Sequence, residues 1–146
     1  MMRISLALAS LLFLACGDAA PAPVTPTTQG GGPLALVASR GKAETFTFED
    51  GQKPMLTFEA ERVRVSASCA KPDGSLDCDA MRALRKGKQV KLGPEATGAN
   101  PGAVACKKLG FRNTTGRAAS GNEDGFCIFP DGSMASTGAL DMYVTE

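Results

Sequence analysis

The chain of 146 residues contains no histidine. This absence excludes Ser-His-Asp and Cys-His catalysis, histidine metal ligands and acid–base chemistry by an imidazole. Residues 39–42, SRGK, have the S-x-x-K spacing of serine acyl-enzymes, but the S-D-N and K-T-G motifs of those enzymes do not occur. We therefore interpret this stretch as a turn before the first strand. The sequence predicts a protein that is not an enzyme and has no cofactor other than a lipid and no small-molecule substrate.

An excess of charge of either sign is also missing. The chain has 16 Lys and Arg and 15 Asp and Glu side chains, and Arg3 is the one charged residue in 1–15, so 15 of each follow (16 − 1 = 15). Nucleic-acid binding needs clustered cationic side chains, so no nucleic-acid partner is predicted. The acidic turns at 73–79 and 123–124 lack the D-x-[DN]-x-[DN]-G ladder of calcium loops, so no metal site is predicted.

No two cysteines have the C-x-x-C spacing that marks many zinc sites, which makes a four-thiolate zinc site the weaker alternative. An even number of cysteines in an exported chain predicts disulfides, and four cysteines allow three connectivities. Beyond the first cysteine, Cys16, the four are Cys69, Cys78, Cys106 and Cys127. We expect local pairing, 69–78 and 106–127, which oxidation in the periplasm would maintain.

Residues 1–15 are too short to span a membrane but match a secretion signal. One cation, Arg3, precedes an apolar run over 4–15, and a spanning helix needs about 20 such residues. The segment Phe13–Cys16 resembles the bacterial lipobox. This resemblance implies that Cys16 carries diacylglycerol and an N-acyl chain such as palmitate. An ordinary signal peptide, cleaved a few residues later, is the alternative.

Residues 16–33 read as the lipidated cysteine and a tether. The tether is dominated by Pro, Thr, Ala and Gly, a composition with almost nothing to bury, so we expect it to be disordered. Gly17 and Asp18 follow the lipidated position, and by resemblance to bacterial sorting rules this favours the outer membrane. The sequence thus predicts an outer-membrane lipoprotein, with its membrane face undetermined.

The head begins at residue 34, and its first part, 34–95, is expected to be rich in strands. Phe46 and Phe48 alternate in the strand 44–49, and the apolar parity of 56–69 switches near residues 61–62, which predicts a bulge or bend. A helix is predicted over 77–86, ended by a glycine, and a short strand over 89–92. We expect this part and residues 96–146 to pack as one α+β unit of antiparallel strands and two short helices.

The second part of the head contains the better-marked helix. Asn100 is placed as N-cap, Pro101 as the first helical residue and Gly110 after the end. The strand 126–129 follows, and its frame CIFPDGS at 127–133 repeats CAKPDGS at 69–75. In both copies Pro and Gly favour a tight turn. Two disulfide-supported hairpins are the simpler explanation of the repeat, and a duplication is the alternative.

The stretches ANPGAVACKKLGF (99–111) and GNEDGFCIFPDGS (121–133) resemble a small bacterial secreted domain of unknown function that is known by the label hemolysin. The family pattern is an A-N-P helix start, a cysteine in that helix, a glycine-rich loop and C-x-F-P-D-G. The resemblance covers residues 97–146. Ala135 and Gly138 stand where the family has Cys and Trp, so a surface built on that Trp is not expected here. None of the matching residues is catalytic.

These observations predict a non-enzymatic accessory or binding subunit of an envelope or cell-surface machine for secretion, adhesion or motility, with an envelope protein as its partner. The alternative is an inhibitor of a protease or lysozyme-like enzyme. For that activity the predicted polar loop 113–125 would supply the binding residues Arg117, Asn122 and Glu123. Hemolysin-like membrane activity is the third possibility, and it lacks support because the head has no long amphipathic or apolar segment.

Overall fold

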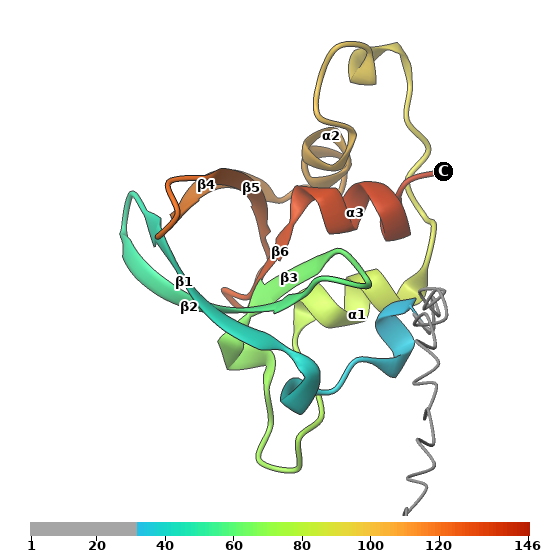
Figure 1. Cartoon of the computed structure of the whole chain (residues 1–146). Coiled ribbons are helices and arrows are strands. Elements are labelled where there is room, and N and C mark those ends of the chain that lie inside the picture. Colours follow the sequence, from blue (N-terminus) through green and yellow to red (C-terminus); the bar gives the residue numbers. More distant parts are fainter. Residues whose placement is uncertain (1–31) are drawn as a thin grey trace, which may run out of the picture.

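The computed structural model of the chain describes residues 32–146, so Cys16 and most of the predicted tether lie outside the described residues. The described part is α+β, as predicted, with a six-stranded antiparallel barrel beside three α-helices (Figure 1). The strands are β1 (Lys42–Phe48), β2 (Gly51–Phe58), β3 (Val63–Ser66), β4 (Arg112–Ala118), β5 (Glu123–Ile128) and β6 (Met134–Ser136), and the helices are α1 (Asp79–Lys86), α2 (Pro101–Lys108) and α3 (Thr137–Val144). None of the helices in this described part is long and apolar enough to cross a membrane.

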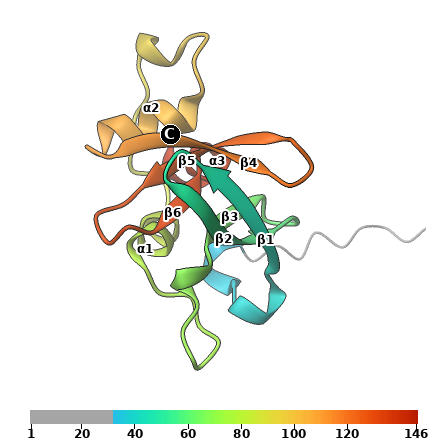
Figure 2. The same ribbon diagram turned by 90° about the vertical axis from the view of Figure 1, so that its left-hand side faces the viewer.

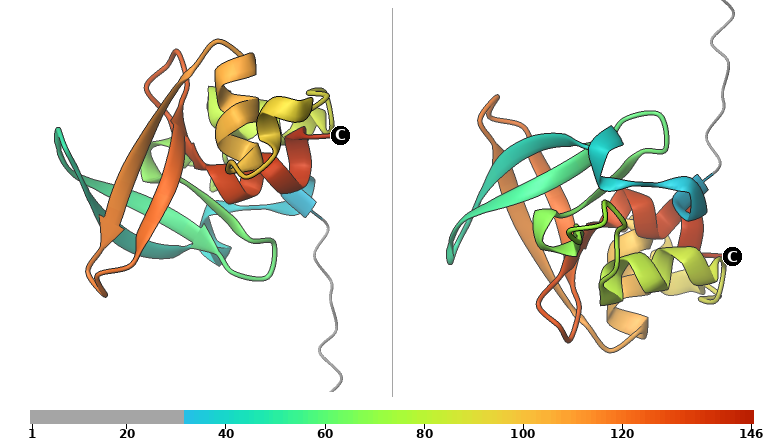
Figure 3. Two further views of the ribbon diagram at one scale, coloured as in Figure 1. Left: turned by 90° about the horizontal axis from the view of Figure 1, so that it is seen from above. Right: turned by 90° about the horizontal axis from the view of Figure 1, so that it is seen from below.

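The barrel combines strands from both parts of the head in the order β1-β2-β3-β6-β5-β4. The hairpins β1–β2 and β4–β5 are long, with seven and six residue pairs. The seams between the two parts are much shorter. β1 meets β4 at two pairs, Phe46 with Ala118 and Thr47 with Arg117. β3 meets β6 at one pair, Val65 with Ala135. The two hairpins cross and project away from the helices (Figures 2 and 3).

Aromatic and methionine side chains fill the barrel interior. Strand side chains alternate between two faces, and the inward face carries the apolar cluster Phe46, Phe48, Met55, Phe126 and Met134. The rings of Phe46 and Phe48 each lie 5.2 Å from that of Phe126, in edge-to-face arrangements. This confirms the prediction that Phe46 and Phe48 share a buried face.

The outward face of the same strands packs against the helices in a second apolar cluster, which contains residues from both parts of the head. Val63 and Val65 of β3 and Ala105 of α2 belong to it. Both expected disulfides are present, Cys69–Cys78 and Cys106–Cys127, with Cα atoms 5.0 Å and 5.7 Å apart. The second disulfide joins α2 to β5. The two parts of the head therefore share one core.

The second Pro-Asp-Gly-Ser turn, residues 130–133, caps helix α1. The Asp131 carboxylate accepts a 2.8 Å hydrogen bond from the amide of Asp79, and the Ser133 hydroxyl accepts one of 3.1 Å from the amide of Ala80. In return, the Asp79 carboxylate accepts from the amide of Asp131 at 3.2 Å. The amides of Asp79 and Ala80 lie in the first turn of α1 and have no acceptor inside the helix. The Pro-Asp-Gly-Ser turn therefore supplies the acceptors for two N–H groups that the helix itself leaves unpaired. The repeated turn is thus a contact between the two parts of the head.

The predicted N-cap of α2 and the glycines after both helices are confirmed, whereas α1 begins at Asp79 rather than at residue 77, and several other predictions are wrong. Asn100 caps α2, and Gly87 and Gly110 follow α1 and α2 with φ of 78° and 83°. The predicted strand 89–92 is a single bridge between Val90 and Thr145. The predicted loop 113–125 is instead largely the β4–β5 hairpin. Its polar residues form strands because they pair with β1 and with each other. The last segment of the chain, for which no element was predicted, forms a third helix, α3. The predicted bend near residues 61–62 is a full turn between β2 and β3.

Replacing Asp131 with Ala is expected to lower the free energy of unfolding by about 1–2 kcal/mol, because the first amide of α1 loses its acceptor. The first copy of the turn supplies a matched control, since the Asp73 carboxylate accepts from Ser75 within its own turn. Asp73→Ala should therefore cost clearly less than Asp131→Ala. Urea denaturation of both variants measures the difference, and equal losses would show that the second turn does not stabilise α1.

Candidate functional site

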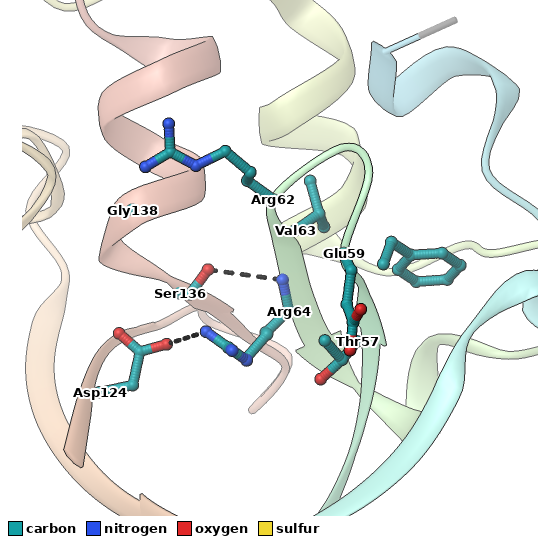
Figure 4. A pocket seen from close by; sticks show the side chains of 9 residues that line it. Thr57, Glu59, Arg62, Val63, Arg64, Asp124, Ser136 and Gly138 are labelled. Atoms are coloured by element: carbon teal, nitrogen blue, oxygen red, sulfur yellow. Dashed lines mark hydrogen bonds and ion pairs between the residues drawn. The ribbon is translucent and has the colours of Figure 1, made fainter. Parts of the chain in front are cut away.

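The best-defined polar site among the described residues is one end of the barrel interior, which we call the barrel mouth and define as Glu44, Thr57, Arg64, Asp124 and Ser136. Figure 4 shows Thr57, Arg64, Asp124 and Ser136. By strand alternation these residues lie on the inward face, next to the aromatic and methionine cluster. They come from five strands, β1, β2, β3, β5 and β6. Barrel mouths are a frequent location of binding sites, because several strand ends converge there.

Arg64 is the central group of the barrel mouth. Its Nη1 donates to Asp124 Oδ2 at 2.8 Å, and its guanidinium carbon lies 6.0 Å from the centre of the Phe46 ring, which it covers. This ion pair crosses the gap that opens where the three-residue strand β6 ends. The side chain of Arg64 is 40% exposed and that of Asp124 26%, so the pair is accessible from solvent.

Glu44 is the second carboxylate of the barrel mouth. It accepts a 2.5 Å hydrogen bond from the Thr57 hydroxyl and lies 3.2 Å from Lys42 Nζ and 3.9 Å from Arg64 Nε. The hydrogen bond from Thr57 is the main reason why the pKa of Glu44 lies below its ordinary value of 4.5. The positive charges of Lys42 and Arg64 lower the pKa further, whereas partial burial raises it. An ionised carboxylate with a lowered pKa is a poor general acid at neutral pH. Glu44 is therefore a poor proton donor at neutral pH.

Two cavities meet at the ion pair of Arg64 and Asp124. One, of about 410 Å³, also reaches Arg62 and Gly138, and the other, of about 290 Å³, reaches the predicted binding residues Asn122 and Glu123. The third predicted binding residue, Arg117, lines neither cavity. It lies opposite Glu123 in the hairpin and forms an ion pair with it. The structure thus brings two of the three predicted residues to the barrel mouth.

Sequence reasoning missed the central residues of this site. Arg64 and Asp124 lie 60 positions apart in the chain, and no local motif links them. The sequence contained one signal for these residues. Each of the apolar strand segments MLTF and VRVS has a polar residue among its apolar ones, Thr57 in the first and Arg64 in the second. A polar residue on the inward face of a small barrel marks an end of its core. In residues 32–146 no group of three or more His, Cys, Asp or Glu side chains is arranged to hold a metal ion.

Residues 97–140 match the model of a protein family described as a domain of unknown function, DUF333. The matched region begins before α2, includes β4 to β6 and ends within α3. It covers less than half of the chain. The expected similarity of the C-terminal third to a domain of unknown function is confirmed at this level. None of the curated proteins and none of the solved structures compared with the chain matches it. The barrel mouth combines residues inside and outside the matched region.

Replacing Thr57 with Val should raise the pKa of Glu44 toward 4.5, because the largest contribution to its lowered value is removed. Thr57→Ser keeps the hydroxyl and should keep the lowered pKa. A carbon-13 NMR titration of the carboxyl groups measures both.

Because folding lowers the pKa of Glu44, this carboxylate stabilises the protein fully above its pKa in the unfolded chain. The stabilisation is lost as the pH falls through its pKa in the folded protein. The stability difference between the wild type and Glu44→Gln should therefore shrink from about pH 6 to about pH 3. An unchanged pKa in Thr57→Val would contradict this assignment.

Proposed function

We propose that the protein is a lipid-anchored, non-enzymatic binding subunit of the outer membrane, and that it holds or stabilises an envelope protein at a secretion, adhesion or motility machine. The observation that carries this proposal is the barrel mouth, where an exposed guanidinium and two carboxylates converge beside two open cavities. Its carboxylates already have cationic partners, an arrangement that favours recognition over acid–base catalysis.

The arrangement of the head supports an anchor on one side and binding on the other. Pro33, near the start of the described residues, lies against the helical side, where its carbonyl accepts a 3.3 Å hydrogen bond from Arg85. Both β-hairpins project on the opposite side, away from the first described residues (Figure 3). A tether that enters on the helical side would leave the two hairpins free for a partner.

Inhibition of a protease or lysozyme-like enzyme stays the alternative prediction. An inhibitory loop needs side chains that project freely toward the target enzyme. Arg117, one of the predicted binding residues, lies in the β4–β5 hairpin, and its side chain is 62% exposed. Its backbone pairs with β1 at Thr47, and its guanidinium pairs with Glu123.

In-cell crosslinking of the full-length protein, tagged at its C-terminus and purified from the outer-membrane fraction, tests the proposed function. We expect mass spectrometry to recover one dominant envelope protein, and we expect Cys16→Ala to abolish that crosslink, because the unlipidated chain is no longer held at the membrane. A Cys16→Ala protein that is secreted and folded, with both disulfides formed, provides the control. Recovery of the protein alone, or of the same partner without lipidation, would contradict the proposal.

A further inference from the structure

The larger cavity of the barrel mouth contains two arginine side chains with different environments. Arg64 lies on β3 and Arg62 in the turn before it, and both line the cavity of about 410 Å³ (Figure 4). The guanidinium of Arg62 lies next to the first turn of α3, and that of Arg64 points toward Asp124, with Ser136 between them. Two guanidinium groups on one open cavity form a candidate site for an anionic group.

The two guanidinium groups have donors to spare. A guanidinium carries five N–H donors, and within residues 32–146 Asp124 is the one hydrogen-bond acceptor of the Arg64 side chain. Arg64 Nε is buried and has no hydrogen-bond partner among these residues. In the same range, no hydrogen bond or ion pair joins the side chain of Arg62 to another residue. Arg64 Nε is out of reach of a ligand because it is buried, so the unused donors that a ligand with two adjacent oxygen atoms would find are those of Arg62 and Arg64 Nη2.

The charges that line the cavity balance, because Arg62 and Arg64 stand against the two carboxylates Glu59 and Asp124, and a neutral cavity disfavours a dianion more than a singly charged anion. Asp124 is neutralised by Arg64, and Glu59, the other carboxylate on the cavity, lies 4.0 Å from Lys42. Arg62 is the cation of the cavity without such a partner among the described residues. A phosphate dianion would be repelled by both carboxylates, whereas a carboxylate brings one charge and the planar shape that a guanidinium binds in bidentate fashion.

The backbone next to the cavity favours a carboxylate on an extended peptide. The ladder of β6 ends at Ser136, so Asp124 in β5 and Val63 in β3 lie beyond its last residue pairs. The Arg64 amide is bonded to the Ser136 hydroxyl at a long 3.4 Å rather than to a strand. Asp124 and Val63 themselves stay paired with Gly116 of β4 and Phe58 of β2, so the Arg64 amide, with its long hydrogen bond, is the backbone donor here that an extended segment of a partner protein could use.

We propose that the cavity binds a carboxylate group presented by a partner protein, at its C-terminus or on an acidic side chain, and that Arg62 and Arg64 are the residues that hold it. This inference rests on the proposed function, because it specifies which chemical group the binding subunit recognises. Arg62 supplies the unpaired charge, and Arg64 supplies a guanidinium already oriented by Asp124. The Arg64 amide, whose hydrogen bond to the Ser136 hydroxyl is long, supplies a backbone donor.

NMR titration of the mature chain, with Cys16→Ser to keep it free of lipid, tests this inference. The probes are an acetylated tetrapeptide of Gly and Ala with a free C-terminus, the same peptide with a C-terminal amide, and sodium acetate. We expect the free-acid peptide to shift the Arg64 Nε–H signal and the amides of residues 63, 64 and 124 saturably, with a Kd on the order of 1 mM. The amidated peptide should cause no such shift, and acetate should bind much more weakly than the free-acid peptide.

Three variants make the assignment specific. Arg62→Gly removes the unpaired cation at a residue with φ of 56°, a conformation that glycine adopts readily, so this variant is expected to fold. Arg64→Lys keeps the charge and removes the planar donor group. Each should weaken binding of the free-acid peptide about tenfold or more, the effect of losing a charged hydrogen bond. Arg112→Lys, at the opposite end of the barrel, is the matched control and should leave the affinity unchanged.

Three results would overturn the inference: equal shifts from the acid and amide peptides, no saturable shift by about ten times the expected Kd, or full affinity in Arg62→Gly and Arg64→Lys. Binding of acetate as tight as that of the peptide would show a site for free small anions and would overturn the assignment to a partner protein. If the peptide experiments gave one of these contradicting results while crosslinking still recovered an envelope protein, the proposed function would stand. Only the assignment of a carboxylate ligand to the cavity would then be wrong.

Discussion

The narrow seams between the two parts of the head constrain the rest of the structure. The barrel closes through one residue pair between β3 and β6 and two between β1 and β4, so the backbone ladder contributes little at the places where the two parts meet. A barrel must nevertheless close to leave no strand edge exposed. Side-chain contacts and a shared apolar core therefore supply most of the attraction between the two parts.

Each seam contact has a visible structural consequence. Because β6 has three residues, the sheet opens beyond Ser136, and the ion pair of Arg64 and Asp124 spans the opening. The barrel mouth is this opening. The turn containing Asp131 caps the first turn of α1 and so ties the end of β5 to the other part of the head. Arg64 and Asp124, the central residues of the candidate binding site, thus also connect the two parts of the head.

Local features of the sequence predicted local structure correctly. The N-cap of α2 and the glycines that follow α1 and α2 were predictable because these signals act within a few residues, and both disulfides join cysteines that are close in the chain. The β4–β5 hairpin was mistaken for a loop because its Thr, Asn, Gly and Arg residues are poor strand signals, and its pairing with β1 joins distant segments. The barrel mouth depends on the same distant pairing. Neither the ion pair of Arg64 and Asp124 nor the cavity beside Arg62 has a signature in consecutive residues.

Native-state hydrogen exchange measures most directly whether the two parts of the head form one unit closed through these seams. If they do, the slowest amides of β2, from the first part, and of β5, from the second, open with the same free energy, because neither part keeps its core after the other unfolds. That free energy should equal the one obtained from urea denaturation. Two separate levels of protection, with the part that contains β5 staying closed after β2 has opened, would show two independent units and would contradict the barrel mouth as a single binding site.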